Sequence, residues 1–151
     1  KNMDELNELE MYEKKCEEIR RTNDSLLELF EKDMEGLSPK TIRRHLSNVD
    51  FYINEFLLYA DALPMEYGLG KIDEFLGEFF IRKCMWSTPA TIKSTAASIK
   101  KFYKCMLDHG KIEKGDYKFF CETVKVGMED WQALCAQYND PEEENPFGFF
   151  W

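Results

Sequence analysis

Apolar residues recur at steps of three and four along most of the chain, which is the spacing that places them on one face of an α-helix. The first such face belongs to residues 3–21 and contains Met3, Leu6, Leu9, Tyr12, Cys16 and Ile19. Ser25 and Glu28 then form a capping box, which predicts a second, short helix from residue 26 to residue 35, closed by Gly36. We therefore expect two separate helices before residue 36.

Two longer helices begin with the same pair of signals, an N-cap residue followed by proline at the first helical position. Ser38 is the N-cap of the first, which we expect to cover residues 38–59. Thr88 is the N-cap of the second, which we expect to cover residues 88–109 and to end at Gly110.

The remaining segments are also helical by pattern. Residues 72–80 are strongly apolar on one side, and two more helices are expected at 117–126 and 128–138, with Gly127 between them. The chain from residue 140 onward holds two prolines and a run of glutamates, so we expect it to be irregular. Strict apolar alternation is missing, so the fold class is predicted to be all-α, a helical bundle with an added N-terminal helix and a C-terminal helix plus tail.

The charge of the chain is unevenly distributed. The net charge is −9, with 20 basic and 29 acidic residues, which does not favour binding to nucleic acid. Residues 1–35 hold six basic and twelve acidic groups, and residues 121–151 hold one and seven. Residues 81–120, by contrast, hold nine basic and three acidic groups. A basic middle between acidic ends is compatible with a local phosphate-binding surface.

Motifs for catalysis, cofactors and metals are missing from the sequence. There is no glycine-rich phosphate loop and no zinc-type pair of cysteines, and neither histidine, His45 or His109, lies in a catalytic pattern. The five cysteines are widely spaced and odd in number, which is typical of reduced thiols in a cytoplasmic protein. No apolar stretch of about 18 residues is present to span a membrane. We therefore expect a cytoplasmic binding protein with no cofactor, no metal, no membrane segment and no enzymatic activity.

Beside its apolar stripe, the helix at 88–109 is expected to carry a ridge of lysines, when residues are placed at 100° intervals. The ridge consists of Lys93, Lys100 and Lys104 with Ala97 between them, Lys101 lies further round the helix, and Ser94 is available for polar contacts. The helix at 38–59 carries a shorter counterpart, made of Lys40, Arg43, Arg44 and Ser47, with Asn54 also expected on this flank. If the two helices lie side by side, these flanks border one surface suited to a phosphate backbone. A solvated helix face, an acidic partner, or the chain's own run at residues 142–144 are the competing interpretations.

Two ordered segments carry a family resemblance. They read GLSPKTIRRHLSNVDFYINEFL at residues 36–57 and STPATIKSTAASIKKFYKCMLDHGKI at residues 87–112, with the apolar helix at 72–80 between them. In this order they resemble the N-terminal core-binding domain of tyrosine recombinases and phage integrases, a SAM-like helical bundle. The resemblance covers about residues 25–112. Residues 1–24 are then an added helix, and residues 113–151 carry further helices and the tail.

The resemblance implies a bundle that grips duplex DNA through its two long helices. The DNA-facing residues that it implies are Lys40, Arg43, Arg44, Ser47, Lys93, Ser94, Ala97, Lys100, Lys101 and Lys104. The family's catalytic half uses an arginine, a lysine, an H-x-x-R element and a tyrosine nucleophile, and neither histidine here has arginine three residues on. Only 39 residues follow the matched region. We therefore expect a non-catalytic DNA-binding module, derived from or working beside the recombinases of DNA integration.

The last five residues of the chain include four aromatic side chains. These are Phe147, Phe149, Phe150 and Trp151. Such side chains are costly to leave in water, so they either fold back into a groove of their own domain or dock into a second copy or another protein. A homo-oligomer formed through this tail or through the first helix belongs to the alternative function, an acidic protein-interaction scaffold that binds no nucleic acid.

Overall fold

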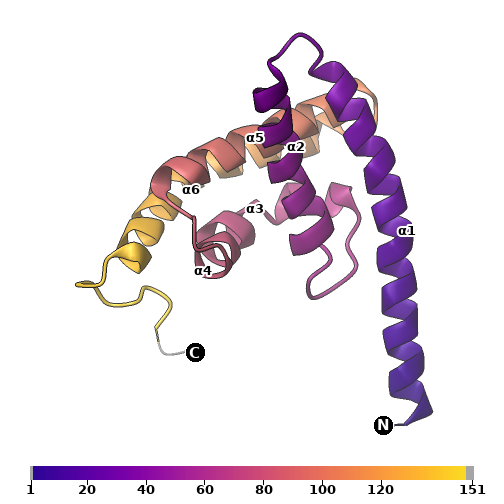
Figure 1. Cartoon of the computed structure of the whole chain (residues 1–151), viewed down its shortest axis with the longest axis horizontal. Coiled ribbons are helices and arrows are strands. Elements are labelled where there is room, and N and C mark those ends of the chain that lie inside the picture. Colours follow the sequence, from indigo (N-terminus) through magenta and orange to yellow (C-terminus); the bar gives the residue numbers. More distant parts are fainter. Residues whose placement is uncertain (1, 149–151) are drawn as a thin grey trace. The chain divides into compact units, whose positions relative to one another are not determined.

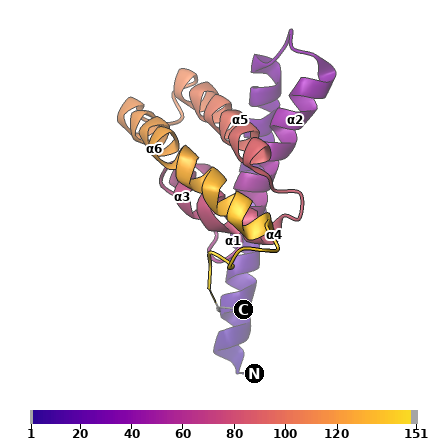
Figure 2. The ribbon, with the colours of Figure 1, turned by 90° about the vertical axis from the view of Figure 1, so that its left-hand side faces the viewer.

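The computed structural model describes residues 2–148, and every regular element among them is a helix. The predicted all-α class is therefore confirmed. The chain forms two compact units, Lys1–Gly68 and Leu69–Trp151, which are taken one at a time below. Figures 1 and 2 show the ribbon from two directions.

In the first unit a long helix turns back into a shorter one. The elements are α1 (Met3–Asp33), α2 (Pro39–Asp50) and the π-helical η1 (Phe51–Phe56), which continues α2 without a break. A turn at Gly36, whose φ of 103° favours glycine, reverses the chain, so α1 and α2 lie side by side and antiparallel (Figure 1). The first turns of α1 extend beyond α2, and every residue from Asn2 to Met11 is exposed.

α1 is a single helix, so the predicted break at Ser25 is wrong. Residues 22–25 resemble a helix start because their short polar side chains favour N-caps. In the structure Asn23 is only 1% exposed, and its Nδ2 donates to Asn54 Oδ1 at 2.7 Å and to Ile53 O at 3.3 Å. Asn23, two residues before the predicted cap Ser25, is thus bound to η1 from within α1, and no glycine or proline interrupts the helix.

A small apolar cluster joins the middle of α1 to the segment after η1. Cys16 and Ile19 are buried together with Leu58 and Ala62, and Tyr12 packs against them. The Tyr12 hydroxyl donates to the Leu58 carbonyl. Packing within the first unit therefore fixes α1 from Tyr12 onward, while the turns of α1 before Tyr12 stay exposed.

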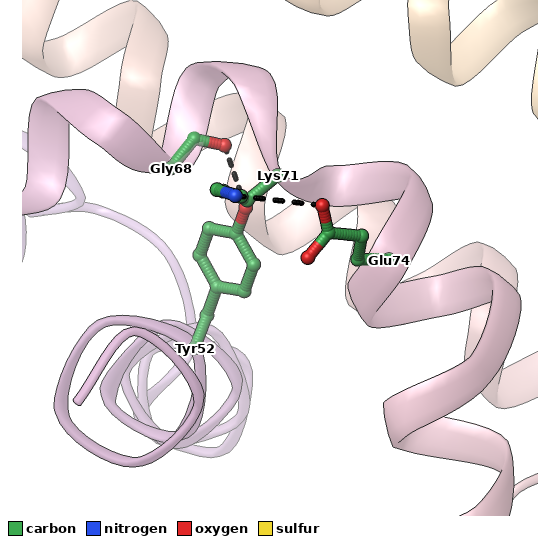
Figure 3. A network of polar contacts seen from close by, with 4 residues as sticks. All are labelled: Tyr52, Gly68, Lys71 and Glu74. Atoms are coloured by element: carbon green, nitrogen blue, oxygen red, sulfur yellow. Dashed lines mark hydrogen bonds and ion pairs between the residues drawn. The ribbon is translucent and has the colours of Figure 1, made fainter. Parts of the chain in front are cut away.

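Two polar contacts close to the junction of the units are drawn in Figure 3. In the first unit Tyr52 is fully buried, and its hydroxyl donates to the Gly68 carbonyl at 2.6 Å, which fastens the end of that unit to η1. In the second unit Lys71 and Glu74 form an ion pair with an Nζ–Oε1 distance of 3.4 Å. The ion pair is exposed and contributes about 0–1 kcal/mol. The buried tyrosine is therefore the stronger constraint.

The second unit is built on a pair of long helices. A short 3₁₀ helix, η2 (Met65–Gly70), leads into α3 (Ile72–Glu74), the π-helical η3 (Phe75–Phe79), α4 (Phe80–Lys83), α5 (Pro89–Asp108) and α6 (Lys114–Asn139). α3, η3 and α4 form one continuous helical stretch that packs against α6. α5 and α6 lie side by side and antiparallel (Figure 2), with the ring centroids of Tyr103 and Phe120 5.1 Å apart.

α6 is also a single helix, so the predicted break at Gly127 is wrong. Gly127 makes room for the indole of Trp131, since a Cβ at position 127 would lie 2.4 Å from its Cζ2. A Cβ at Gly77 of η3 would lie 3.1 Å from its Cδ1. The indole Nε1 donates to Asp73 Oδ1 at 2.7 Å. Two glycines and a carboxylate thus hold this buried ring, which fixes residues 72–83 on α6.

Gly127→Ala is expected to destabilise the fold, although a helix interior is normally about 1 kcal/mol more stable with alanine than with glycine. The new methyl group would overlap the indole of Trp131, which Asp73 and the tight approach at Gly77 hold in place. Such overpacking costs about 1–3 kcal/mol, so urea unfolding should show a net loss of stability. Gly115→Ala lies in the same helix with open space around its new Cβ and should be neutral or stabilising. Equal effects of the two substitutions would contradict the role of Gly127.

Candidate nucleic-acid interface

Both long helices begin at the predicted residues. The Ser38 hydroxyl accepts from the Thr41 amide at 3.2 Å, and the Thr88 hydroxyl accepts from the Thr91 amide at 3.1 Å. The Thr91 hydroxyl in turn accepts from the Thr88 amide at 2.7 Å, which completes a capping box. The caps set where each helix starts, so the side-chain directions counted from the sequence hold in α5 and in α2 as far as Asp50. Beyond it the helix is π-helical, and Asn54, expected on the exposed flank, is buried.

α5 is exposed along one narrow strip. From residue 93 to residue 104 the exposed positions are Lys93, Ala97, Lys100, Lys101 and Lys104, and no others. We call these five residues the lysine strip. These five positions are exposed, as expected for the flank of this helix, and their contact with DNA stays a prediction. Ser94, also in the expected set, is half-buried, and its hydroxyl donates to Thr91 O at 3.4 Å.

The lysine strip ends beside an acid. Lys104 Nζ lies 2.6 Å from Asp108 Oδ1, one turn later on α5. Both side chains are more than half exposed, so the pair contributes little and is easily replaced by another anion. Within the part of the chain that the structure describes, no ion pair engages Lys93, Lys100 or Lys101. Most of the ammonium groups of the strip are therefore available to an anionic ligand.

The first turns of α2 carry their predicted basic residues at exposed positions. The exposed residues of the predicted set are Lys40, Arg43, Arg44 and Ser47. Asp50 follows on the same side of the helix, so the positive character ends there. α2 belongs to the first unit and α5 to the second, and the surface that their flanks were expected to share stays a prediction.

A groove that the spacing of apolar residues does not reveal runs between α1 and α2 in the first unit. Its floor is formed by the half-buried Leu27, Ile42 and Leu46. It comprises two hollows of about 490 and 670 Å³ that share Glu28 and Glu31. The acids that line it are visible in the sequence, and the predicted break at Ser25 separates only Asp24 from the others. The sequence pattern does not show that α2 packs beside this face of α1.

The described part of the tail folds back on its own unit. Phe147 is half-buried, with its ring centroid 5.8 Å from that of Tyr138 and 5.7 Å from the guanidinium carbon of Arg82. Packing within the domain therefore accounts for this aromatic residue. Outside the described residues lie Phe149, Phe150 and Trp151. Docking of those three side chains stays a prediction.

The five cysteines are free thiols, and two of them have a raised pKa. Burial raises the pKa of Cys84 to about 11. Burial also raises the pKa of Cys135, although hydrogen bonds with Ser87 and Asn139 act in the opposite direction. A raised pKa keeps a thiol protonated, whereas a nucleophile needs the thiolate. The positions of Cys84 and Cys135 therefore suit packing and not reaction.

Comparison with known proteins adds no assignment to this geometry. No protein-family model, curated protein or solved structure matches the chain. Among residues 2–148, no helix combines the length and the apolar character needed to cross a bilayer. The function is therefore argued from the exposed side chains themselves.

Raising the pH from about 9 to about 11 is expected to weaken the fold through Cys84. Because the pKa of the folded thiol, about 11, lies above its ordinary value of 9.0, the folded state keeps a proton that the unfolded state loses in this window. Stability that is fully present below pH 9 is then lost as the pH rises, by about 2–3 kcal/mol at most. Urea unfolding on both sides of the window measures the loss, with Cys84→Ser, which does not titrate, as control. An identical pH dependence in both proteins would rule out this contribution.

Proposed function

We propose that this protein binds duplex DNA as a non-catalytic module, mainly through phosphate contacts made by the lysine strip of α5. The observation that carries the proposal is the composition of that strip, since α5 exposes only lysine and alanine from residue 93 to residue 104. Ammonium groups on flexible stems follow phosphate positions without reading bases. Binding is therefore expected to have weak sequence preference and steep salt dependence.

The dimensions of the lysine strip suit a stretch of DNA backbone. Lys93 and Lys104 are eleven positions apart, which is about 16 Å along a helix. B-DNA carries one phosphate charge per about 1.7 Å of its axis, so several phosphates lie within reach of four lysines. Ala97, a single methyl group in the middle of the strip, lets the helix approach the duplex closely.

The net charge of −9 is compatible with this function. Exposed charges farther apart than about 8–10 Å are largely screened at 0.1–0.15 M salt. A phosphate at the strip therefore responds mainly to the charges of α5 itself, which from residue 93 to residue 108 are four lysines and one aspartate. The acidic ends lower the affinity at low salt more than they do at physiological salt.

The basic turns of α2 and the family resemblance support the same function. Lys40, Arg43 and Arg44 are exposed, as a phosphate contact requires. The resemblance to the core-binding domain of tyrosine recombinases implies that both long helices face DNA. Under this proposal the chain is a SAM-like bundle that grips DNA, and strand transfer belongs to a separate recombinase.

A protein-interaction scaffold is the second candidate. The observation that favours it is the exposure of apolar side chains in the first turns of α1, where Met3 is 71% exposed, Leu6 42% and Leu9 50%. Neighbouring exposed apolar residues are typical of a surface that packs on another protein. Binding of duplex DNA at low salt separates the two candidates, because only the first predicts it.

Lys100→Glu combined with Lys104→Glu is expected to abolish binding to random-sequence duplex DNA at low salt, because two of the four ammonium groups in the strip become carboxylates. Fluorescence anisotropy measures the binding, and the melting temperature should change little since both positions are exposed. Lys118→Glu combined with Lys125→Glu changes the net charge equally at exposed positions of α6 and should keep most of the binding. Wild-type protein that does not bind duplex DNA at low salt would overturn the proposal.

The salt dependence of binding should report the lysine strip one residue at a time. For B-DNA, log K falls with log salt by about 0.9 for each phosphate that the protein neutralises. Lys93→Gln is therefore expected to reduce the slope by about 0.9 and to weaken binding alike on every DNA sequence. Titrations between about 50 and 200 mM salt measure both effects. An unchanged slope places Lys93 outside the DNA contact.

A further inference from the structure

The groove between α1 and α2 carries a row of uncompensated acids. Asp24, Glu28, Glu31 and Glu35 are exposed and line it from the α1 side, and we call these four residues the acidic row. Steps of four and three keep Asp24, Glu28 and Glu31 on one face of α1, and Glu35 follows in the turn after its C-cap, Met34. Lys32 also lines the groove, but no ion pair recorded among residues 2–148 engages a member of the row.

The charges around this groove favour a cationic occupant. Residues 1–68 hold nine basic and sixteen acidic groups. Like charges three or four positions apart on a helix repel each other, so the acidic row is a cost to the isolated chain that a row of cations would relieve. Because Leu27, Ile42 and Leu46 form an apolar floor, an occupant that also buries aliphatic surface against them binds more favourably. Lysine side chains, with apolar stems and charged heads, meet both requirements.

The lysine strip repeats the spacing of the acidic row. Four of its five residues, Lys93, Ala97, Lys100 and Lys104, are also separated in sequence by steps of four, three and four, and Lys101 lies outside this series. We propose that the groove binds the lysine strip of a second copy of this chain, helix along helix. Whether the helices align parallel or antiparallel, two lysines face carboxylates of α1, and a third lies toward Glu35 in the turn that follows.

The contact joins unlike surfaces, because the acidic row belongs to the first unit and the lysine strip to the second. In a pair of copies held by such a heterologous contact, one copy still has an unoccupied acidic row and the other an unoccupied lysine strip. Further copies can therefore bind at both ends and form chains or rings. Exposed ion pairs are individually weak and are screened by salt. Assembly is therefore expected at high protein concentration and low ionic strength.

The self-contact uses the same lysine strip as the proposed DNA contact, so duplex DNA and a second copy compete for it. It does not rest on DNA binding, however, because it also needs the acidic row, which plays no part in holding phosphates. Substitutions in the acidic row therefore test the self-contact alone.

Charge reversal on each side of the contact provides the test. The two variants are Glu28→Lys with Glu31→Lys, and Lys100→Glu with Lys104→Glu. In sedimentation velocity at about 50 mM salt, the mass of the wild-type protein should rise with concentration and return to the monomer at about 500 mM. Each variant alone should stay monomeric. An equimolar mixture should associate again, since each variant keeps the surface that the other has lost.

Glu8→Lys with Glu18→Lys is the matched control, because it makes the same charge change at exposed positions on other faces of α1 and should associate like the wild type. Circular dichroism checks that the variants stay helical, and Glu28→Gln with Glu31→Gln, which should also lose association, replaces the first variant if it unfolds. A wild-type monomer at every concentration overturns the proposal. Association that survives in both reversed variants, or a mixture that fails to associate, overturns it as well. DNA binding by the Glu28→Lys, Glu31→Lys variant is measured separately, because it tests the proposed function and not the self-contact.

Discussion

Burial of α5 on all sides but one is the constraint on which the proposed chemistry depends. Ile92, Ile99 and Tyr103 are fully buried, and the ring of Tyr103 lies 5.1 Å from that of Phe120 on α6. A helix packed in this way cannot turn about its axis, because close-packed interiors leave no room for the displaced side chains. The lysines of α5 therefore present their charge along one strip. A local positive surface can exist in this way on a chain with a net charge of −9.

The two proposed contacts follow from a separation of charge along the chain. The acidic row lies on the last turns of α1 and in the turn after it, and the lysine strip lies on α5. Most members of both lack an ion-pair partner among the described residues. One strip that serves both DNA and a second copy acts as a simple switch, because occupation by either ligand excludes the other. The relative concentrations of DNA and protein then decide which contact forms, by mass action.

Much of the fold and part of the site follow from local sequence signals. Ser38 and Thr88 begin their helices as predicted, because a cap and its amide partner are three residues apart and need no distant contact. The exposed lysines of α5 follow from the same cap and from helical periodicity. The predicted breaks at Ser25 and Gly127 are wrong because the deciding partners are remote. Asn23 is held by Asn54, and the indole above Gly127 is held by Asp73.

The sequence by itself determined the all-α class, the starts of both long helices and the flank of α5 that carries the lysines. Those features depend on hydrogen bonds and side-chain directions within a few residues of each other. Only the tertiary structure decided that α1 and α6 are continuous, that Phe147 packs against Tyr138, and that an acid-lined groove separates α1 from α2. Each of these depends on contacts between residues that helical periodicity does not relate, so no local pattern could have specified them.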